Sequence, residues 1–203
     1  MQSTTESNPR RKQDIEAIQY LSTAQQGLLF HAREHAGEDP YFSQDVFVLE
    51  GELSEAAFEQ AWTDVIARHP LLRSDFRFED VPKPMQLQFR PRPALIQRLD
   101  WRDEPDSEAA LQNHLAQVRA AGFDFAQAAD TLLTLIQLTD SRWYFIWSYH
   151  HVAVDGWSFA VVLRDFLVCY DTRVAGRLPS LQPTRPFKDY LGWLGSQDTA
   201  AAE

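Results

Sequence analysis

The pattern of apolar and polar positions changes sharply at one point in the last third of the chain. Residues 143–149, WYFIWSY, are nearly all aromatic or β-branched, which predicts a strand with both faces covered. After Gly156, apolar residues such as Phe159 and Phe166 recur at helical spacing and predict a helix over 157–173. Because buried elements hold both of its ends, the loop between them suits a functional site.

Other patterned segments predict a domain of mixed helices and strands. Ser22, with Gln25 three residues later, has the spacing of a capping box and predicts the start of a helix. Ser54 is expected to cap a second helix, which ends before Pro70. Prolines on both sides of residues 85–90 favour an edge strand there. The remaining predicted elements are strands at 45–50, 71–78, 95–100 and 131–138, the last in a hairpin with 143–149, and a helix at 108–121.

Composition narrows the class of protein. The chain of 203 residues is 44% hydrophobic, enough for a packed core. Its net charge of -10 argues against a nucleic-acid partner, since phosphate binding needs a basic face. The single cysteine, Cys169, lies on an apolar helix face and is expected to pack in the core. With no apolar run of transmembrane length and no signal peptide, the sequence predicts a cytoplasmic protein without membrane contact.

His150 and His151 stand at the end of the predicted central strand. Adjacent side chains of a strand point to opposite faces, so one ring should turn into the fold and the other toward a cleft. This arrangement argues against a metal site, because neighbouring strand residues do not converge on one ion. A lone histidine is most often structural, but the fixed spacing to Asp155 and Gly156 favours a functional motif.

HHxxxDG followed by Trp157 and Ser158 resembles the active-site motif of condensation domains from nonribosomal peptide synthetases. These domains belong to the chloramphenicol-acetyltransferase-like superfamily. The resemblance implies that His151 faces the tunnel in which an amine attacks a thioester, and that His150 is structural. It also implies that Asp155 is structural and pairs with an arginine elsewhere in the same lobe.

Three further segments resemble motifs of the same family and occur in the family's order. They are LSTAQQGLLF at 21–30, RHPLLRSDF at 68–76 and FKDYLGWL at 187–194. In the second segment Pro70 stands where the family usually has glutamate, and Arg73 matches the arginine expected to pair with Asp155. An inward-pointing arginine needs a partner, but the sequence equally allows Arg73 to face solvent.

The resemblance also implies the fold and the domain organisation. We expect an α/β fold, in the form of a two-layer α+β sandwich whose mixed, mostly antiparallel sheet is covered by helices. Residues 1–14 are interpreted as a flexible leader or docking segment, and 15–177 as the N-terminal lobe. Residues 178–203 are interpreted as a linker with the fourth motif and a polar tail, the C-terminal lobe being absent. The start at Met1 suggests the beginning of a synthetase subunit.

The implied reaction forms an amide between a donor acyl thioester and the amine of an acceptor aminoacyl thioester. His151 would position the amine and accept its proton, without a bound cofactor. The amides of Gly156 and Trp157 would stabilise an oxyanion, although Gly156 is equally well explained by a tight turn. Ser158 is expected to cap the helix rather than to act as a nucleophile, because no G-x-S-x-G surrounds it.

The expected partners are donor and acceptor peptidyl carrier proteins, whose phosphopantetheine arms deliver the substrates. Another synthetase subunit or an acyl-coenzyme A donor is a further candidate partner. Because half a tunnel does not enclose a reaction, the isolated lobe is expected to be inactive alone. Two alternatives stay open: a coenzyme A-dependent acyltransferase, and a non-catalytic module that binds a carrier or docks a subunit.

Overall fold

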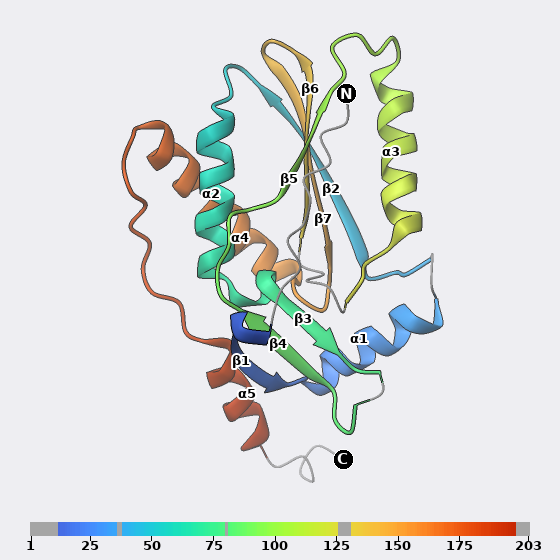
Figure 1. Cartoon of the computed structure of the whole chain (residues 1–203), viewed down its shortest axis with the longest axis vertical. Helices are drawn as coiled ribbons and strands as arrows, with labels where there is room; N and C mark the ends of the chain where they lie inside the picture. Colours follow the sequence, from blue (N-terminus) through green and yellow to red (C-terminus); the bar gives the residue numbers. More distant parts are fainter. Residues whose placement is uncertain (1–11, 36–37, 80, 126–130, 198–203) are drawn as a thin grey trace.

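The computed structural model describes residues 12–35, 38–79, 81–125 and 131–197 (Figure 1). Its centre is a four-stranded sheet in the order β2–β7–β6–β5. The strands are β2 (Phe42–Glu50), β7 (Arg142–His150), β6 (Leu132–Thr139) and β5 (Ile96–Asp100). β6 and β7 form the predicted antiparallel hairpin, β2 pairs antiparallel with β7, and β5 pairs parallel with β6.

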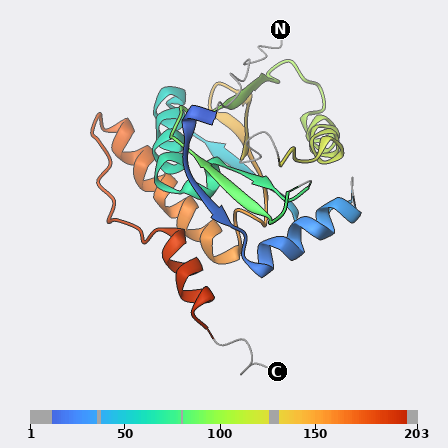
Figure 2. The same cartoon turned by 60° about the horizontal axis from the view of Figure 1, so that its bottom comes forward.

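β7 is buried on both faces, as its composition predicts. Phe145 and Trp147 lie in the larger core, whereas Tyr144 and Ile146 lie in a smaller cluster on the opposite face. The helices α2 (Glu55–Arg68) and α4 (Gly156–Val174) lie side by side over the first face, and α3 (Ser107–Ala121) covers the other (Figures 1 and 2). Trp62 of α2 stacks on Phe166 of α4 with ring centroids 4.9 Å apart, which ties the two helices together.

A second, smaller sheet lies at one end of the molecule beside α1 (Thr23–Glu34) (Figure 1). It is antiparallel in the order β1–β4–β3. Its strands are β1 (Ile15–Tyr20), β4 (Met85–Phe89) and β3 (Ser74–Arg77). The small sheet and α1 lie near the C-terminal end of β7, whose last residue is His150 (Figure 1).

The fold class is confirmed, but in the smaller sheet two local predictions are wrong and one strand was missed. The segment 15–20 was not predicted as a strand, although it alternates in exposure. The strand predicted at 71–78 begins only at Ser74, because Pro70 starts a 3-10 turn, η2 (Pro70–Arg73). β4 is the central strand and not an edge, because β1 covers its second side. The neighbouring prolines lie outside β4 and remove none of its ladder amides.

The helix starts agree with the sequence. Ser22 and Gln25 form the expected capping box at α1, and the Ser54 side chain accepts from the Ala57 amide at α2. Cys169 is 1% exposed, and burial raises the pKa of its thiol to about 11. Every helix in the described part of the chain is too short or too polar to span a bilayer.

The structure describes only parts of the predicted leader and of the predicted tail. Residues 1–11 of the predicted leader and 198–203 of the predicted tail lie outside the described residues. Residues 12–14 form a 3-10 turn, η1 (Lys12–Asp14), whose last carbonyl accepts from the Arg90 amide at 2.8 Å. A linker leads past α2 and α4 to α5 (Phe187–Gly195), in which no residue is buried (Figure 2). The proposed lobe boundaries stay predictions.

Candidate active site

The HHxxxDG motif forms the turn between the central strand and α4. The last residue of β7 is His150, and α4 begins at Gly156. Within the turn, the amides of Ala153 and Val154 donate to the His150 carbonyl at 3.0 and 3.2 Å. The His151 amide donates to the Tyr41 carbonyl at 3.0 Å, which attaches the turn to the segment preceding β2. The loop is therefore fixed by its own backbone and by the neighbouring strand.

His150 is completely buried and serves the fold. Its Nδ1 accepts from the Val152 amide at 3.0 Å, so the ring proton is on Nε2, which lies 2.9 Å from Asp39 Oδ2. The edge of the ring packs on Phe125, with centroids 4.9 Å apart. Burial lowers the pKa of His150 to about 4, against the opposing attraction of Asp39. The ring is therefore neutral near pH 7 and holds the turn in place.

His151 is partly exposed and is held at both ring nitrogens. Its Nδ1 lies 3.0 Å from the Val154 carbonyl oxygen, so Nδ1 carries the proton and Nε2 has the lone pair. The Ser43 hydroxyl lies 3.2 Å from Nε2 and can donate to it. The two histidines thus differ in burial, with His150 inside the fold and His151 partly exposed. Sequence reasoning missed Ser43, since only the β2–β7 pairing brings it to this ring.

Asp155 caps α4 and does not pair with Arg73, so the predicted ion pair is wrong. Its side chain accepts from the Ser158 amide at 2.7 Å, and the Ser158 hydroxyl accepts from the Asp155 amide at 2.8 Å. This capping box confirms Ser158 as a first-turn residue. Hydrogen bonds from Ser158 lower the pKa of the Asp155 carboxyl, which keeps it ionised at the helix N-terminus.

Arg73 belongs to a different contact. It is 5% exposed, and its Nη1 donates to Glu16 Oε2 at 2.6 Å and to the Phe89 carbonyl. The guanidinium lowers the pKa of the Glu16 carboxyl. Arg73 therefore joins η2 to the small sheet. Its partner was hidden from sequence reasoning because β1, which carries Glu16, was not predicted.

Gly156 and Trp157 do not have the environment that the predicted oxyanion site requires. The carboxylate of Asp155 already binds the amides at this end of α4, and the Trp157 amide contributes to its lowered pKa. A substrate oxyanion at the same amides would be repelled by that carboxylate. The tight-turn explanation of Gly156 also fails, since its φ lies outside the left-handed region. A side chain on Gly156 would meet no atom within 4 Å, and Trp157 is 88% exposed.

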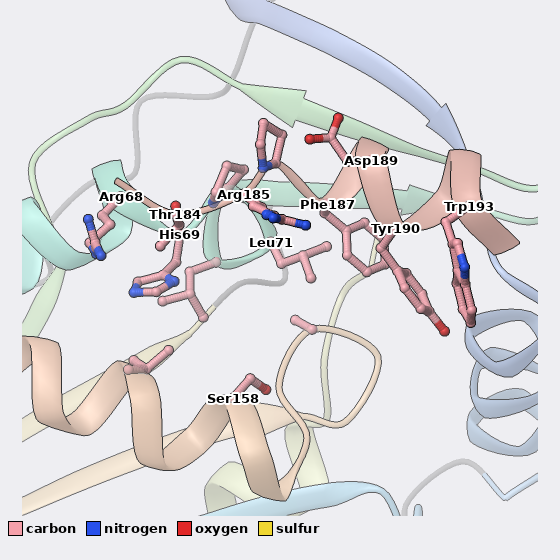
Figure 3. A pocket seen from close by; sticks show the side chains of 15 residues that line it. Arg68, His69, Leu71, Ser158, Thr184, Arg185, Phe187, Asp189, Tyr190 and Trp193 are labelled. Atoms are coloured by element: carbon pink, nitrogen blue, oxygen red, sulfur yellow. The ribbon is translucent and has the colours of Figure 1, made fainter. Parts of the chain in front are cut away.

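A pocket of about 490 Å³ lies next to the motif, between η2, the first turns of α4 and α5 (Figure 3). Ser158 faces it from α4, across from His69 and Leu71 (Figure 3). The aromatic rings of α5 line one end. His151 does not line this pocket, so the pocket and the imidazole are separate features of the loop.

Behind this pocket, a buried carboxylate connects α4 to the second family motif. Asp165 has no exposed surface and lies 2.7 Å from Arg68 Nε and 3.0 Å from His69 Nε2. Arg164 Nη2 lies 2.7 Å from its other oxygen. Burial raises the pKa of Asp165, but the hydrogen bonds from these three partners outweigh burial and lower it. One feature of the sequence could have predicted this buried carboxylate: an aspartate on the apolar face of α4, between Val162 and Cys169.

The described residues contain no cluster of three or more histidine, cysteine, aspartate or glutamate side chains that could hold a metal ion.

Comparison with known proteins identifies the family. Residues 15–203 match the family model of the condensation domain. The chain is 34% identical over 194 residues to bacitracin synthase 3 from Bacillus licheniformis, covering 95% of this chain and 3% of that protein. It is 30% identical over 193 residues to surfactin synthase subunit 3 from Bacillus subtilis (strain 168), covering 94% of this chain and 15% of that protein. The chain thus spans a small part of the curated relatives it matches.

Solved structures show the same fold. The starter condensation domain of rhizomide synthetase matches with a TM-score of 0.77 at 20% identity, over 89% of this chain and 43% of that chain. The X-domain complexed with OxyB, from teicoplanin biosynthesis, matches with a TM-score of 0.73 at 26% identity. That match covers 95% of this chain and 39% of the solved one. The chain belongs to the condensation-domain family.

Proposed function

We propose that this chain supplies the histidine of a condensation site that joins a donor acyl group to an acceptor amine. The observation that carries the proposal is His151, whose Nδ1 is bound to the Val154 carbonyl and whose Nε2 lone pair is on a partly exposed ring. The relatives support it, because the bacitracin and surfactin proteins are named as synthases.

In the proposed reaction the acceptor amine attacks the thioester carbonyl carbon, and a C–N bond forms. The C–S bond then breaks, and the thiol leaves with the proton that the amine loses. The amine replaces the Ser43 hydroxyl as the hydrogen-bond donor to His151 Nε2, and this bond aims the lone pair of the amine at the carbonyl carbon. Transfer of the proton to Nε2 and then to the leaving sulfur balances the step. His150 takes no part, because its ring is completely buried and its Nδ1 accepts from the Val152 amide.

The proposed substrates are an acyl thioester and an aminoacyl thioester on the phosphopantetheine arms of donor and acceptor carrier proteins. The arms are part of the substrates and not a resident group of this chain. An acyl-coenzyme A donor would present the same thioester on the same pantetheine chemistry without a carrier protein. The two donors therefore differ in whether a protein surface contributes to binding.

A second candidate function is a protein-binding module. The observation that favours it is the structural match to the X-domain, which was solved as a complex with OxyB. If the chain has this function, His151 is present but takes part in no chemical reaction. The partial exposure of the His151 ring and its Nδ1 hydrogen bond to the Val154 carbonyl make condensation the better supported function.

The test mixes an acyl-loaded donor carrier with an aminoacyl-loaded acceptor carrier and follows the carriers by intact-protein mass spectrometry. Two forms of the protein are tested. The first is this chain alone, and the second is this chain joined to the part of a condensation domain that lies outside the region matched in the solved relatives. Condensation predicts that the acyl mass moves to the acceptor carrier with the joined form. Transfer from acyl-coenzyme A at an equal rate would favour the carrier-independent reaction. Carrier binding without any transfer would favour the binding module.

A further inference from the structure

Gln25, in the first turn of α1, is a buried amide whose hydrogen-bonding positions are all used. Its Oε1 accepts from the Ser22 amide at 3.0 Å and from the Ser22 hydroxyl at 3.2 Å. Its Nε2 donates to Gln86 Oε1 at 3.2 Å and to the Val152 carbonyl at 3.3 Å. The side chain therefore caps α1 with its oxygen and binds the histidine loop with its nitrogen.

Val152 directly follows His151, and both its backbone amide and its backbone carbonyl are hydrogen-bonded. Its amide donates to His150 Nδ1 at 3.0 Å, and its carbonyl accepts from Gln25. Val152 is 3% exposed, so water does not easily replace a lost donor at this carbonyl. A buried acceptor without a partner is unfavourable, and the loop would have to rotate to satisfy it.

The peptide held by Gln25 lies next to the groups that orient His151. The ring of His151 donates to the Val154 carbonyl, two residues beyond Val152 in the same turn. Because the turn is short, rotation of the Val152 peptide moves the Val154 carbonyl as well. The direction of the Nε2 lone pair is therefore coupled to the amide of Gln25.

The amide of Gln25 has its own support in the small sheet. Gln86, in β4, is 2% exposed and donates from Nε2 to Gln19 Oε1 in β1 at 2.7 Å. Gln86 Oε1 must then face Gln25, and this fixes which end of the Gln25 amide faces Val152. A chain of three amides, of which Gln25 and Gln86 are buried, thus runs from the small sheet to the histidine loop.

We propose that Gln25 is a positioning residue that acts on His151 through the Val152 carbonyl. The proposal deepens the proposed function and rests on it for the catalytic consequence. The simpler explanation is that Gln25 only caps α1, since glutamine at this position completes a capping box with Ser22.

Gln25→Glu separates these two roles. Glutamate keeps the oxygens that accept from Ser22 and is equally suited to a capping box, but its carboxylate has no hydrogen to donate to Val152. Gln25→Met, which removes both functions without adding a charge, is the second variant if the glutamate variant does not fold. The matched control is Gln26→Glu, the same change at the exposed next residue.

Two readouts are needed. The first is imidazole ¹H–¹⁵N NMR on this chain, in which the His151 signals are identified by their loss in His151→Asn. The second is the condensation rate of the form joined to the rest of a condensation domain. We expect Gln25→Glu to shift His151 away from the Nδ1–H tautomer and to lower kcat roughly 10- to 100-fold with KM for the carriers unchanged. Gln26→Glu should leave both readouts unchanged.

Unchanged His151 signals in a folded Gln25→Glu chain would overturn the inference, even if the rate fell, because the effect would not pass through His151. Shifted His151 signals with an unchanged rate would support the positioning role and contradict the proposed function. The first failure thus belongs to the inference, and the second to the function on which it rests.

Discussion

His151 donates its Nδ1 proton to the carbonyl of Val154, three residues further along the same loop, at 3.0 Å. In the neutral ring this bond places the proton on Nδ1 and leaves the lone pair on Nε2, which lies 3.2 Å from the Ser43 hydroxyl. A histidine that positions an amine needs this tautomer, because a protonated Nε2 would repel the nucleophile's hydrogen. The structure thus prepares the ring for the proposed role before any substrate is present.

Ser43 holds the other side of the same ring. Its hydroxyl lies 3.2 Å from His151 Nε2, and Ser43→Ala removes one of the two restraints on the imidazole. We predict that the condensation rate falls by roughly 3- to 10-fold without a change in melting temperature. The measurement is a single-turnover rate, with the exposed Ser141→Ala as the matched control. A Ser43→Ala rate equal to that of Ser141→Ala would show that this restraint has no catalytic effect.

The buried His150 predicts a loss of stability in mild acid. Its pKa is lowered to about 4, mainly by burial, so between about pH 6.5 and 4 the unfolded chain takes up a proton that the folded chain does not. Stability should therefore fall as the pH drops through this range, by about 2 kcal/mol from this group at pH 5. Urea unfolding at pH 7.5 and 5 measures the change. In His150→Asn the loss of unfolding free energy between pH 7.5 and 5 should be smaller by that amount. An equal loss in both proteins would contradict the lowered pKa of His150.

A double-mutant cycle distinguishes the two partners considered for Arg73. The structure joins Arg73 to Glu16, which is half exposed, and caps Asp155 with Ser158 instead. We predict a coupling free energy of about 0.5–1 kcal/mol between Arg73→Ala and Glu16→Ala, and coupling below about 0.3 kcal/mol between Arg73→Ala and Asp155→Ala. The larger coupling in the second cycle would restore the pairing expected from the family motif.

The buried Asp165 should contribute to stability through its contacts with Arg68 and His69. Asp165→Asn leaves Arg68 and His69 without their carboxylate and should reduce the free energy of unfolding by roughly 3 kcal/mol. Asp171→Asn, on the exposed side of the same helix, should change it by less than about 0.5 kcal/mol. Both are measured by urea denaturation. Similar values for the two variants would show that the Asp165 contacts contribute little.

Local patterns predicted the elements around the motif, because they are set by neighbouring residues. The aromatic run of β7 and the capping pairs at Ser22 and Ser54 determine strand and helix boundaries without help from distant parts of the chain. The difference in burial between His150 and His151 was expected from strand geometry, although β7 ends at His150 and His151 lies in the turn.

Contacts between distant segments were not predictable from one sequence. Glu16 reaches Arg73 only because β1 pairs with β4, and β1 itself is short and half exposed. Ser43 reaches His151 only through the register of β2 on β7. The Gln25 side chain looked like a helix cap alone, since its donor side is bound by a residue 127 positions away. These contacts depend on how the elements assemble, and they define most of the site.

The most direct test of the central claim is the single-turnover rate of amide formation by the domain that carries His151→Ala, with loaded carriers and intact-protein mass spectrometry. We predict a loss of roughly 100- to 10,000-fold, while carrier binding is kept and the exposed His35→Ala matches the unchanged protein. Amide formation by His151→Ala at the rate of His35→Ala would contradict a catalytic role of His151 and leave the binding module as the better explanation of this fold.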